Sequence, residues 1–318
     1  MTWGFDALLS PIILFFVLGA AAAFARSDLS VPEAVAKGMS LYLMAAIGLK
    51  GGVQVSGSSV SAEMLGAAAA GMALSFALPA LAFALLRSVG RLDPTNAGAV
   101  AAHYGSVSVV TFVTATEALT VGGLPPAGYM VAVMALMETP AIVTGLLLAR
   151  RSAGGTRLRG DLWRETVLNG SVVLLVGSFV IGLVAGKDGF APIAPVFDVA
   201  FRGILCLFLL DMGLLAARRL QQGRALTARL VGVAVFLPVI NGTIGMGVGL
   251  ALGLGAGTLA VFAVLAASAS YIAVPAAMRL ALPQADPGVS LAMSLGIMFP
   301  VNIIFGIPLS AAAARLAS

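Results

Sequence analysis

The sequence is poor in the residues on which most enzymes and disulfide-linked domains depend. Charged residues make up 10% of its 318 positions, and it has one histidine and one cysteine. These numbers exclude a cluster of Cys and His metal ligands and a disulfide within the chain. No glycine-rich phosphate loop stands out. We therefore expect a protein that is not an enzyme and that carries no cofactor.

Apolar residues are abundant in their place. They make up 60% of the chain, whereas a soluble domain has about half, with about a quarter charged. The apolar runs are continuous and about 20 residues long, which suits helices that span a bilayer and not the alternating strands of a membrane β-barrel. The sequence thus predicts an all-α integral membrane protein embedded in the lipid bilayer. The net charge of +5 comes from short loops between these runs, so we interpret it as a topology signal and expect no nucleic acid as a partner.

Ten apolar segments fit the chain as transmembrane helices. Their predicted ranges are 7–25, 31–49, 61–87, 95–119, 126–149, 164–186, 194–217, 225–252, 256–281 and 288–315. Thirteen basic residues fall in the loops that follow odd-numbered segments, while Lys50, Lys187 and Arg315 fall on the opposite side. By the positive-inside rule, the first set of loops is cytoplasmic and both termini lie on the outer side. We predict a multi-pass protein of a bacterial inner membrane.

The two halves of the chain correspond in sequence. A shift of 165 positions places Lys37-Gly38 on Arg202-Gly203, and it also superposes two polar stretches described below. Because each half has five spans, an odd number, the halves must have opposite orientations in the membrane. We predict a five-plus-five inverted repeat. Residues 1–150 form the first repeat with helices 1–5, residues 151–162 form a cytoplasmic linker, and residues 163–318 form the second repeat with helices 6–10.

Two polar stretches interrupt apolar segments at corresponding places. The fourth segment contains AAHYGSVSVVT at 101–111, and the ninth contains AASASYIAVP at 266–275. A symmetric pair of interruptions indicates a transport site. The N-terminus of a half-helix attracts an anion, and freed carbonyls and hydroxyls suit a sodium ion. We predict that helices 4 and 9 are interrupted; close packing of helices through small residues is the alternative.

The candidate site residues form two groups. Expected to bind the substrate are Tyr104, Gly105, Ser106, Val107, Ser108, Ser268, Ala269, Ser270 and Tyr271. Expected to couple ions or protons are His103, Thr111, Glu138 and Asn302, although His103 and Asn302 also suit hydrogen bonds between helices. The ligands of sodium stay open among Ser106, Ser108, Ser270 and Glu138. Asp211 is a further charge within a span, which we expect to pair with Lys37 or Arg202.

Short motifs in nearly all spans carry a family resemblance. They are VPEA at 31–34, IGLKGG at 47–52, GSVS at 105–108, PAIVT at 140–144, FRGIL at 201–205 and AASAS at 266–270. With them the chain resembles the sodium-dependent bicarbonate transporter family, typified by cyanobacterial high-affinity bicarbonate permeases. The resemblance implies an inverted repeat, a core and a gate domain, a homotrimer, and symport of bicarbonate with sodium. It also implies an anion between 104–108 and 268–272, and places Glu138 at the family's acidic position in the fifth span.

The chain also departs from that family, which leaves alternatives open. Its linker is too short for the long insertion of cyanobacterial members, so we do not expect their small soluble regulator of the PII type. The bulk of His103, Tyr104 and Tyr271 allows a different or larger anion. Alternative functions are a proton-coupled or uncoupled carrier of another small anion such as a short carboxylate, and a non-transporting membrane sensor or scaffold with unbroken helices 4 and 9. An intramembrane hydrolase would need His103 within hydrogen-bond reach of a serine from another span.

Overall fold

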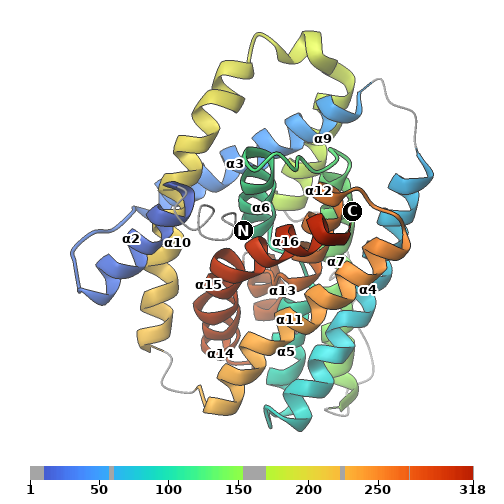
Figure 1. The fold of residues 1–318 in the computed structure, drawn as a ribbon. Helices are drawn as coiled ribbons and strands as arrows, with labels where there is room; N and C mark the ends of the chain where they lie inside the picture. The colour runs from blue at the N-terminus through green and yellow to red at the C-terminus, as the bar shows by residue number, and fades with distance from the viewer. Residues whose placement is uncertain (1–10, 57–60, 153–169, 223–225, 272, 318) are drawn as a thin grey trace.

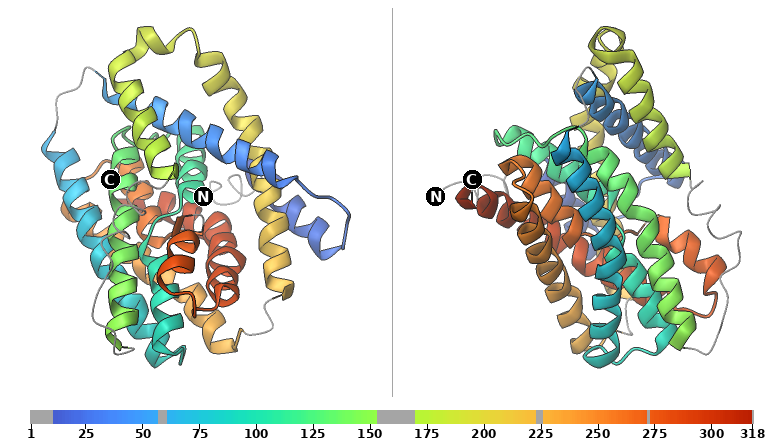
Figure 2. Two further views of the ribbon diagram at one scale, coloured as in Figure 1. Left: turned by 180° about the vertical axis from the view of Figure 1, so that it is seen from behind. Right: turned by 90° about the vertical axis from the view of Figure 1, so that its right-hand side faces the viewer.

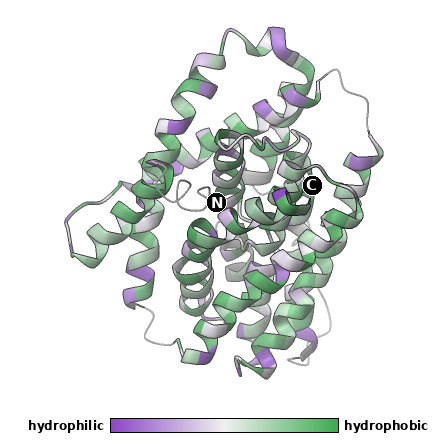
Figure 3. Ribbon diagram, viewed as in Figure 1, coloured by the Kyte–Doolittle hydropathy of each residue, from purple (hydrophilic) through white to green (hydrophobic). Residues whose placement is uncertain are grey.

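A computed structural model of the chain describes residues 11–56, 61–152, 170–222, 226–271 and 273–317. Within these ranges the regular structure is entirely helical. Hydrophobic residues run along the helices, and hydrophilic ones gather toward helix ends and loops (Figure 3). Seven helical segments are long and apolar enough to cross a membrane. The expectation of an all-α multi-pass membrane protein is therefore confirmed.

Four helices form one layer of the molecule. They are α2 (Pro11–Phe24), α3 (Glu33–Val55), α9 (Gly170–Phe190) and α10 (Ala200–Gln222), with the π-helical segment η1 (Pro195–Val199) before α10. Helix α3 packs along α9, and α2 packs along α10. Glycines allow this close approach, since a Cβ added at Gly48 would lie 2.6 Å from the Leu175 carbonyl oxygen of α9. We call these helices the four-helix layer (blue, yellow-green and yellow in Figures 1 and 2).

The remaining helices form a more compact group, the core bundle. It contains α4 (Ala62–Ser88), α5 (Pro94–Gly105), α6 (Val109–Val121), α7 (Met130–Ser152), α11 (Ala228–Ala251), α12 (Ala256–Ala267) and α13 (Ala273–Ala281). It ends with α14 (Pro287–Leu291), η2 (Ala292–Met298), α15 (Phe299–Val301), η3 (Asn302–Gly306) and α16 (Ile307–Ala317), in which η2 and η3 are π-helical. The edge-to-face pair of Phe16 and Phe299, with ring centres 5.4 Å apart, joins the layer to the bundle.

The helices follow the predicted segments with some shifts. The seven long spans match the third to eighth and the tenth predicted segments. The second segment was predicted to end at 49, but α3 continues to Val55 because Gly51 and Gly52 let it pack against neighbouring helices. The fifth starts at Met130 and not at 126, since the turn before it extends that far. The predicted linker at 151–162 lies outside the described residues apart from Arg151 and Ser152.

Candidate functional site

The first break lies between α5 and α6. Helix α5 ends at Gly105, and Ser106 takes an extended backbone with φ −82° and ψ 163°. A side chain at Gly105 would collide with α4, because an added Cβ would lie within 2.9 Å of the Pro79 ring nitrogen. Ser108 then starts α6 as its N-cap, its hydroxyl accepting a 3.1 Å hydrogen bond from the Thr111 amide. The predicted interruption of the fourth span is thus present. Its three residues, Ser106, Val107 and Ser108, are all buried.

The second break lies between α12 and α13. Helix α12 ends at Ala267, and Ser268 takes an extended backbone with φ −85° and ψ 169°. The Ser268 hydroxyl and amide both donate to the Leu265 carbonyl, at 2.8 and 3.1 Å, which closes the helix end. Residues 269–271 are non-helical and buried. The ninth predicted span is therefore interrupted as well, and the unbroken helices that a sensor or scaffold would have are absent at both described sites.

The two breaks are hydrogen-bonded to each other. The Ser108 amide donates to the Ser268 hydroxyl oxygen at 3.0 Å. The Ser270 amide donates to the His103 carbonyl oxygen at 2.9 Å. These two bonds bring residues 160 and 167 positions apart into one crossing of extended chain inside the bundle. We call the segments 106–108 and 268–271 together the crossing.

Two asparagines bind the helix ends that meet at the crossing. The Asn302 amide donates at 2.8 Å to the carbonyl of Ala267, the last residue of α12. The Asn241 amide donates at 3.3 Å to the carbonyl of Tyr104, one residue before the end of α5. A helix end leaves carbonyls without partners, so each amide satisfies a group that the break exposes. Asn302, predicted to couple ions, thus makes a contact between helices through its amide nitrogen.

Ser106 links the crossing to helix α7. Its hydroxyl donates at 3.1 Å to the main-chain oxygen of Glu138. The Glu138 side chain is 3% exposed, and the described residues provide it with no ion pair. The structure therefore brings the backbone of Glu138 to Ser106, and the buried Glu138 carboxylate lies on α7, the helix next to the break. A buried carboxylate without a cation is costly, which favours a role in binding a cation or a proton.

Several buried polar atoms near the crossing have no partner. Among the described side chains, they include His103 Nε2, Thr111 Oγ1, Asn241 Oδ1 and the Tyr271 hydroxyl. Leaving such a group unpaired costs about 1–3 kcal/mol. The atoms of Thr111, Asn241 and Tyr271 indicate a site at the crossing whose polar groups serve a ligand, whereas the His103 ring lines a separate cavity. The described residues hold no cluster of three His, Cys, Asp or Glu side chains suited to a metal.

Two predicted site residues point their side chains away from the crossing. The Tyr104 hydroxyl donates to the Met293 carbonyl at 3.0 Å, so its ring packs toward η2. The Nδ1 atom of His103 lies 2.8 Å from the Ala99 carbonyl on the same helix and must carry a proton there. The imidazole lines a separate cavity of about 120 Å³ together with Pro275 and Ser290. Among the described residues, its ring makes no hydrogen bond to a serine, which is the contact that a hydrolase would need.

An ion pair at the contact of the layer with the bundle was missed by the sequence reasoning. Arg202 on α10 binds Glu117 on α6. The expected pairing of Asp211 with Arg202 is wrong, because the guanidinium lies at the first turn of α10 and reaches across to α6. Glu117 was visible as a charge inside an apolar segment, which is a signal for function. Lys50 pairs with Asp198 at 2.9 Å close by.

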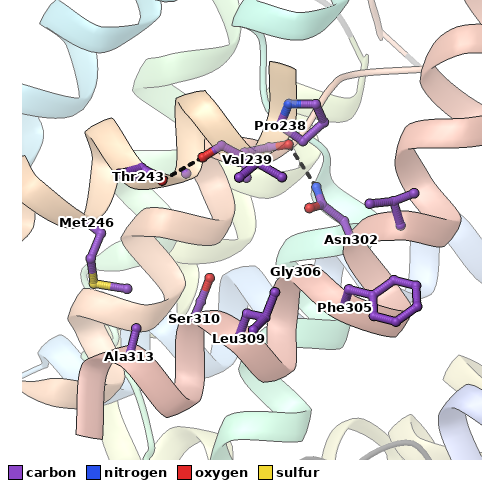
Figure 4. A pocket seen from close by; sticks show the side chains of 13 residues that line it. Pro238, Val239, Thr243, Met246, Asn302, Phe305, Gly306, Leu309, Ser310 and Ala313 are labelled. Atoms are coloured by element: carbon purple, nitrogen blue, oxygen red, sulfur yellow. Dashed lines mark hydrogen bonds between the residues drawn. The ribbon is translucent and has the colours of Figure 1, made fainter. Parts of the chain in front are cut away.

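A groove of about 300 Å³ lies behind the second break, between α11 and α16 (Figure 4). Its walls are mostly apolar, and Phe305 and Leu309 are 57% and 65% exposed. Figure 4 shows the Asn302 side chain at one end of the groove, where it reaches toward α12. An apolar, open wall of this kind faces lipid in a membrane protein. The groove therefore lies beside the crossing without belonging to it.

The comparisons with known proteins agree with the resemblance found in the motifs. Residues 11–315 match the family described as the Na⁺-dependent bicarbonate transporter superfamily. A comparison with curated proteins gave no match. The family match covers both breaks, the asparagines that bind the helix ends, and the Arg202–Glu117 pair.

Proposed function

We propose that this chain, which belongs to the Na⁺-dependent bicarbonate transporter superfamily, is a sodium-coupled symporter of a small anion, with bicarbonate as the leading substrate. The family is one of transporters and not of enzymes. The observation that carries the proposal is the crossing, in which Ser108 and Ser268 from two interrupted helices are hydrogen-bonded to each other. Interrupted helices that meet inside a membrane protein place helix ends and backbone groups where ions bind.

The anion and sodium share the crossing, and Ser270 belongs to both sets of candidate ligands. Helix α6 begins at Val109, so its first amides have no helical acceptor and its positive end faces the break. With the Ser270 hydroxyl and the Tyr271 phenol, these amides bind the anion. Sodium takes oxygen ligands from Ser106, Ser108, Ser270 and Glu138. A sodium ion next to the anion neutralises it, which lowers the cost of moving charge through the apolar bundle.

Transport follows alternating access. The four-helix layer acts as the gate domain and the core bundle carries the crossing, and one moves against the other. The chain forms a five-plus-five inverted repeat, with the halves at 1–150 and 163–318 joined by the linker at 151–162. In support, α5 and α12 are each 12 residues long and each is followed by a capping serine. The protein forms a homotrimer in the bacterial inner membrane with both termini outside, and needs no PII-type regulator.

Uptake by proteoliposomes tests this function. Radiolabelled bicarbonate and small carboxylates are offered with and without an inward sodium gradient. The variant Ser106→Ala with Ser270→Ala should abolish sodium-stimulated uptake, while size-exclusion behaviour and thermal stability in detergent stay close to those of the wild type. Undiminished uptake by this double variant would contradict the proposed site.

A matched control is Ser75→Ala. The Ser75 hydroxyl is buried and donates to the main-chain oxygen of Met137 on α7, next to the Glu138 oxygen that Ser106 binds. Ser75 and Ser106 therefore make the same kind of bond to adjacent carbonyls, but only Ser106 belongs to a break. Ser75→Ala should retain sodium-stimulated uptake.

Proton coupling is a second candidate that a specific observation favours. Glu138 is a buried carboxylate, and His103 Nε2 is a buried ring nitrogen without a partner among the described residues. Groups of this kind carry protons in membrane carriers. In that case a pH gradient drives uptake and a sodium gradient does not. Uptake that proceeds equally well without sodium would replace the leading mechanism by this one.

A further inference from the structure

A polar cluster joins the four-helix layer to the core bundle away from the crossing. Glu117 lies nine residues beyond Ser108 on α6, or roughly 14 Å along the helix at about 1.5 Å per residue. Its side chain is 8% exposed and pairs with the Arg202 guanidinium, which is 62% exposed. The Arg202 guanidinium of the layer thus neutralises the buried Glu117 carboxylate of the bundle. Because the guanidinium has five N–H donors and is largely exposed, some of these donors remain available at the surface.

A cavity of about 90 Å³ lies directly beside this pair. Glu117, Thr116, Thr120 and Gln54 contribute oxygen-bearing side chains to its lining, and the Thr116 hydroxyl has no partner there. Carboxylate, hydroxyl and amide oxygens are the ligands of a hard cation. The space next to the Glu117 carboxylate therefore suits a small cation such as sodium without a change of backbone.

The charges of the cluster sum to zero. Lys50 lines the same cavity, but its ammonium binds Asp198 at 2.9 Å and lies 4.8 Å from the centre of the Phe201 ring. Lys50 and Asp198 cancel each other, as do Arg202 and Glu117. An anion alone or a cation alone would leave one uncompensated charge beside the buried Glu117 side chain, whereas one of each leaves none.

We propose that Arg202 and Glu117 form an access site for the two transported ions. A small planar oxyanion binds the Arg202 guanidinium, sodium binds the Glu117 carboxylate, and the ion pair between layer and bundle is thereby replaced. The fork of the guanidinium matches two oxygens of such an anion. This inference rests on the proposed sodium-coupled transport, and it adds that the layer is released from the bundle only when both ions have arrived.

The access site can be tested without measuring transport, by the rate at which a thiol reagent labels a cysteine in the cavity. Val113 lines the cavity, is 1% exposed and bears no ligand oxygen. Val113→Cys in a Cys206→Ser background is reacted with a maleimide in detergent, where both faces of the protein are reachable. Sodium bicarbonate should speed the labelling at least about tenfold over sodium chloride or choline bicarbonate. Equal labelling rates in all these salts would overturn the access site.

Glu117→Gln tests the requirement for two ions. Glutamine keeps the size of the side chain but removes the charge, so the anion alone then balances Arg202. In this variant choline bicarbonate should speed the labelling as strongly as sodium bicarbonate does. Glu63→Gln is the control, because the Glu63 carboxylate accepts a 2.6 Å hydrogen bond from Tyr129 and has no part in the pair. A continued need for sodium in Glu117→Gln would contradict the proposal.

Arg202→Lys tests the anion half of the access site. Lysine retains the charge but loses the two-donor fork, so the half-saturating bicarbonate concentration for uptake should rise about tenfold while that for sodium stays the same. Unchanged bicarbonate dependence overturns the assignment of Arg202. Sodium-independent uptake by the wild type would instead overturn the proposed function itself, whereas sodium-dependent uptake with salt-independent labelling of Val113→Cys overturns the access site alone.

Discussion

The first and the second break both follow a buried helix of 12 residues and both begin at a serine, yet their surroundings differ. The first is fixed by its own neighbours, because Gly105 contacts Pro79 and Ser108 caps the helix that follows. Among the described residues, the second has no such cap of its own, and the two breaks also hold each other, since the Ser108 amide binds the Ser268 hydroxyl and the Ser270 amide binds the His103 carbonyl.

The difference extends to the side chains that each break offers. The first has Ser106, Thr111 and the nearby Glu138, which are hydroxyl and carboxylate oxygens that suit a cation. The second has the Tyr271 phenol, an uncharged donor that suits an anion, held edge to face against Phe299 with ring centres 5.3 Å apart. We infer that the side chains of the first break serve mainly sodium and those of the second mainly the anion, which the α6 amides also bind. Variants at each break test this division.

Gly105→Ala should disrupt the first break more than any comparable change at the second. The added methyl group meets the Pro79 ring, and overpacking of this kind costs about 1–3 kcal/mol or more. The thermal unfolding midpoint in detergent should fall by several degrees, and uptake should be lost.

Ala267→Gly is the counterpart at the second break, at the last residue of α12. It removes a methyl group and frees the backbone, which costs about 0.5–1 kcal/mol. The midpoint should therefore change much less than in Gly105→Ala. Equal losses in the two variants would show that the first break is not the more constrained one.

Asn302→Ala and Asn241→Ala compare the two asparagines that bind the helix ends. Removing Asn302 leaves the buried Ala267 carbonyl without its 2.8 Å bond, at a cost of about 1–3 kcal/mol. The Asn241 bond is longer, at 3.3 Å, and this side chain also carries an unpaired oxygen, so its removal should cost less. Unfolding midpoints should rank the wild type first, Asn241→Ala second and Asn302→Ala last; the reverse order of the variants would refute the reasoning.

The sequence predicted both breaks but not how they fit together. Glycine and serines within an apolar run indicate where a helix ends, so 105–108 and 268–270 were identified from local chemistry. The shift of 165 places His103 opposite Ser268, whereas the two capping serines, Ser106 and Ser268, are 162 positions apart. Most of that difference arises between α4 and α11, which are 27 and 24 residues long. The bond from Ser108 to Ser268 depends on how whole helices pack, which a local pattern does not encode.

The partners of charged residues are a second feature that could not be predicted from the sequence. Asp211 was expected to pair with Lys37 or with Arg202, which lies nine residues earlier on the same helix. The partner of Arg202 is Glu117, from the other group of helices. A charge within a span predicts that a partner exists, but the choice among several partners is made by tertiary packing.

Tyr271→Phe tests the assignment of the anion to the second break. Phenylalanine keeps the edge-to-face contact with Phe299 and removes a buried hydroxyl that lies near the Ser108 side chain without a well-formed hydrogen bond among the described groups. Stability should stay the same or rise. If the phenol binds the anion, the bicarbonate concentration for half-maximal uptake rises about tenfold, the equivalent of 1.4 kcal/mol, and the sodium concentration does not. A change in the sodium dependence alone would place the phenol with the cation.

Thr111→Val makes the matching change at the first break. Valine has nearly the shape of threonine, and the Thr111 hydroxyl is fully buried without a partner, so the folded state loses no hydrogen bond. The Thr111 amide still donates its hydrogen bond to the Ser108 hydroxyl, which caps α6. If this hydroxyl contributes to the sodium site, the half-saturating sodium concentration rises a few-fold and bicarbonate dependence is unaffected. Thr111→Val and Tyr271→Phe each remove one buried hydroxyl. If the first variant changes only the half-saturating sodium concentration and the second only that of bicarbonate, the crossing is divided between the ions. If both variants change the same concentrations, the ions share one set of ligands.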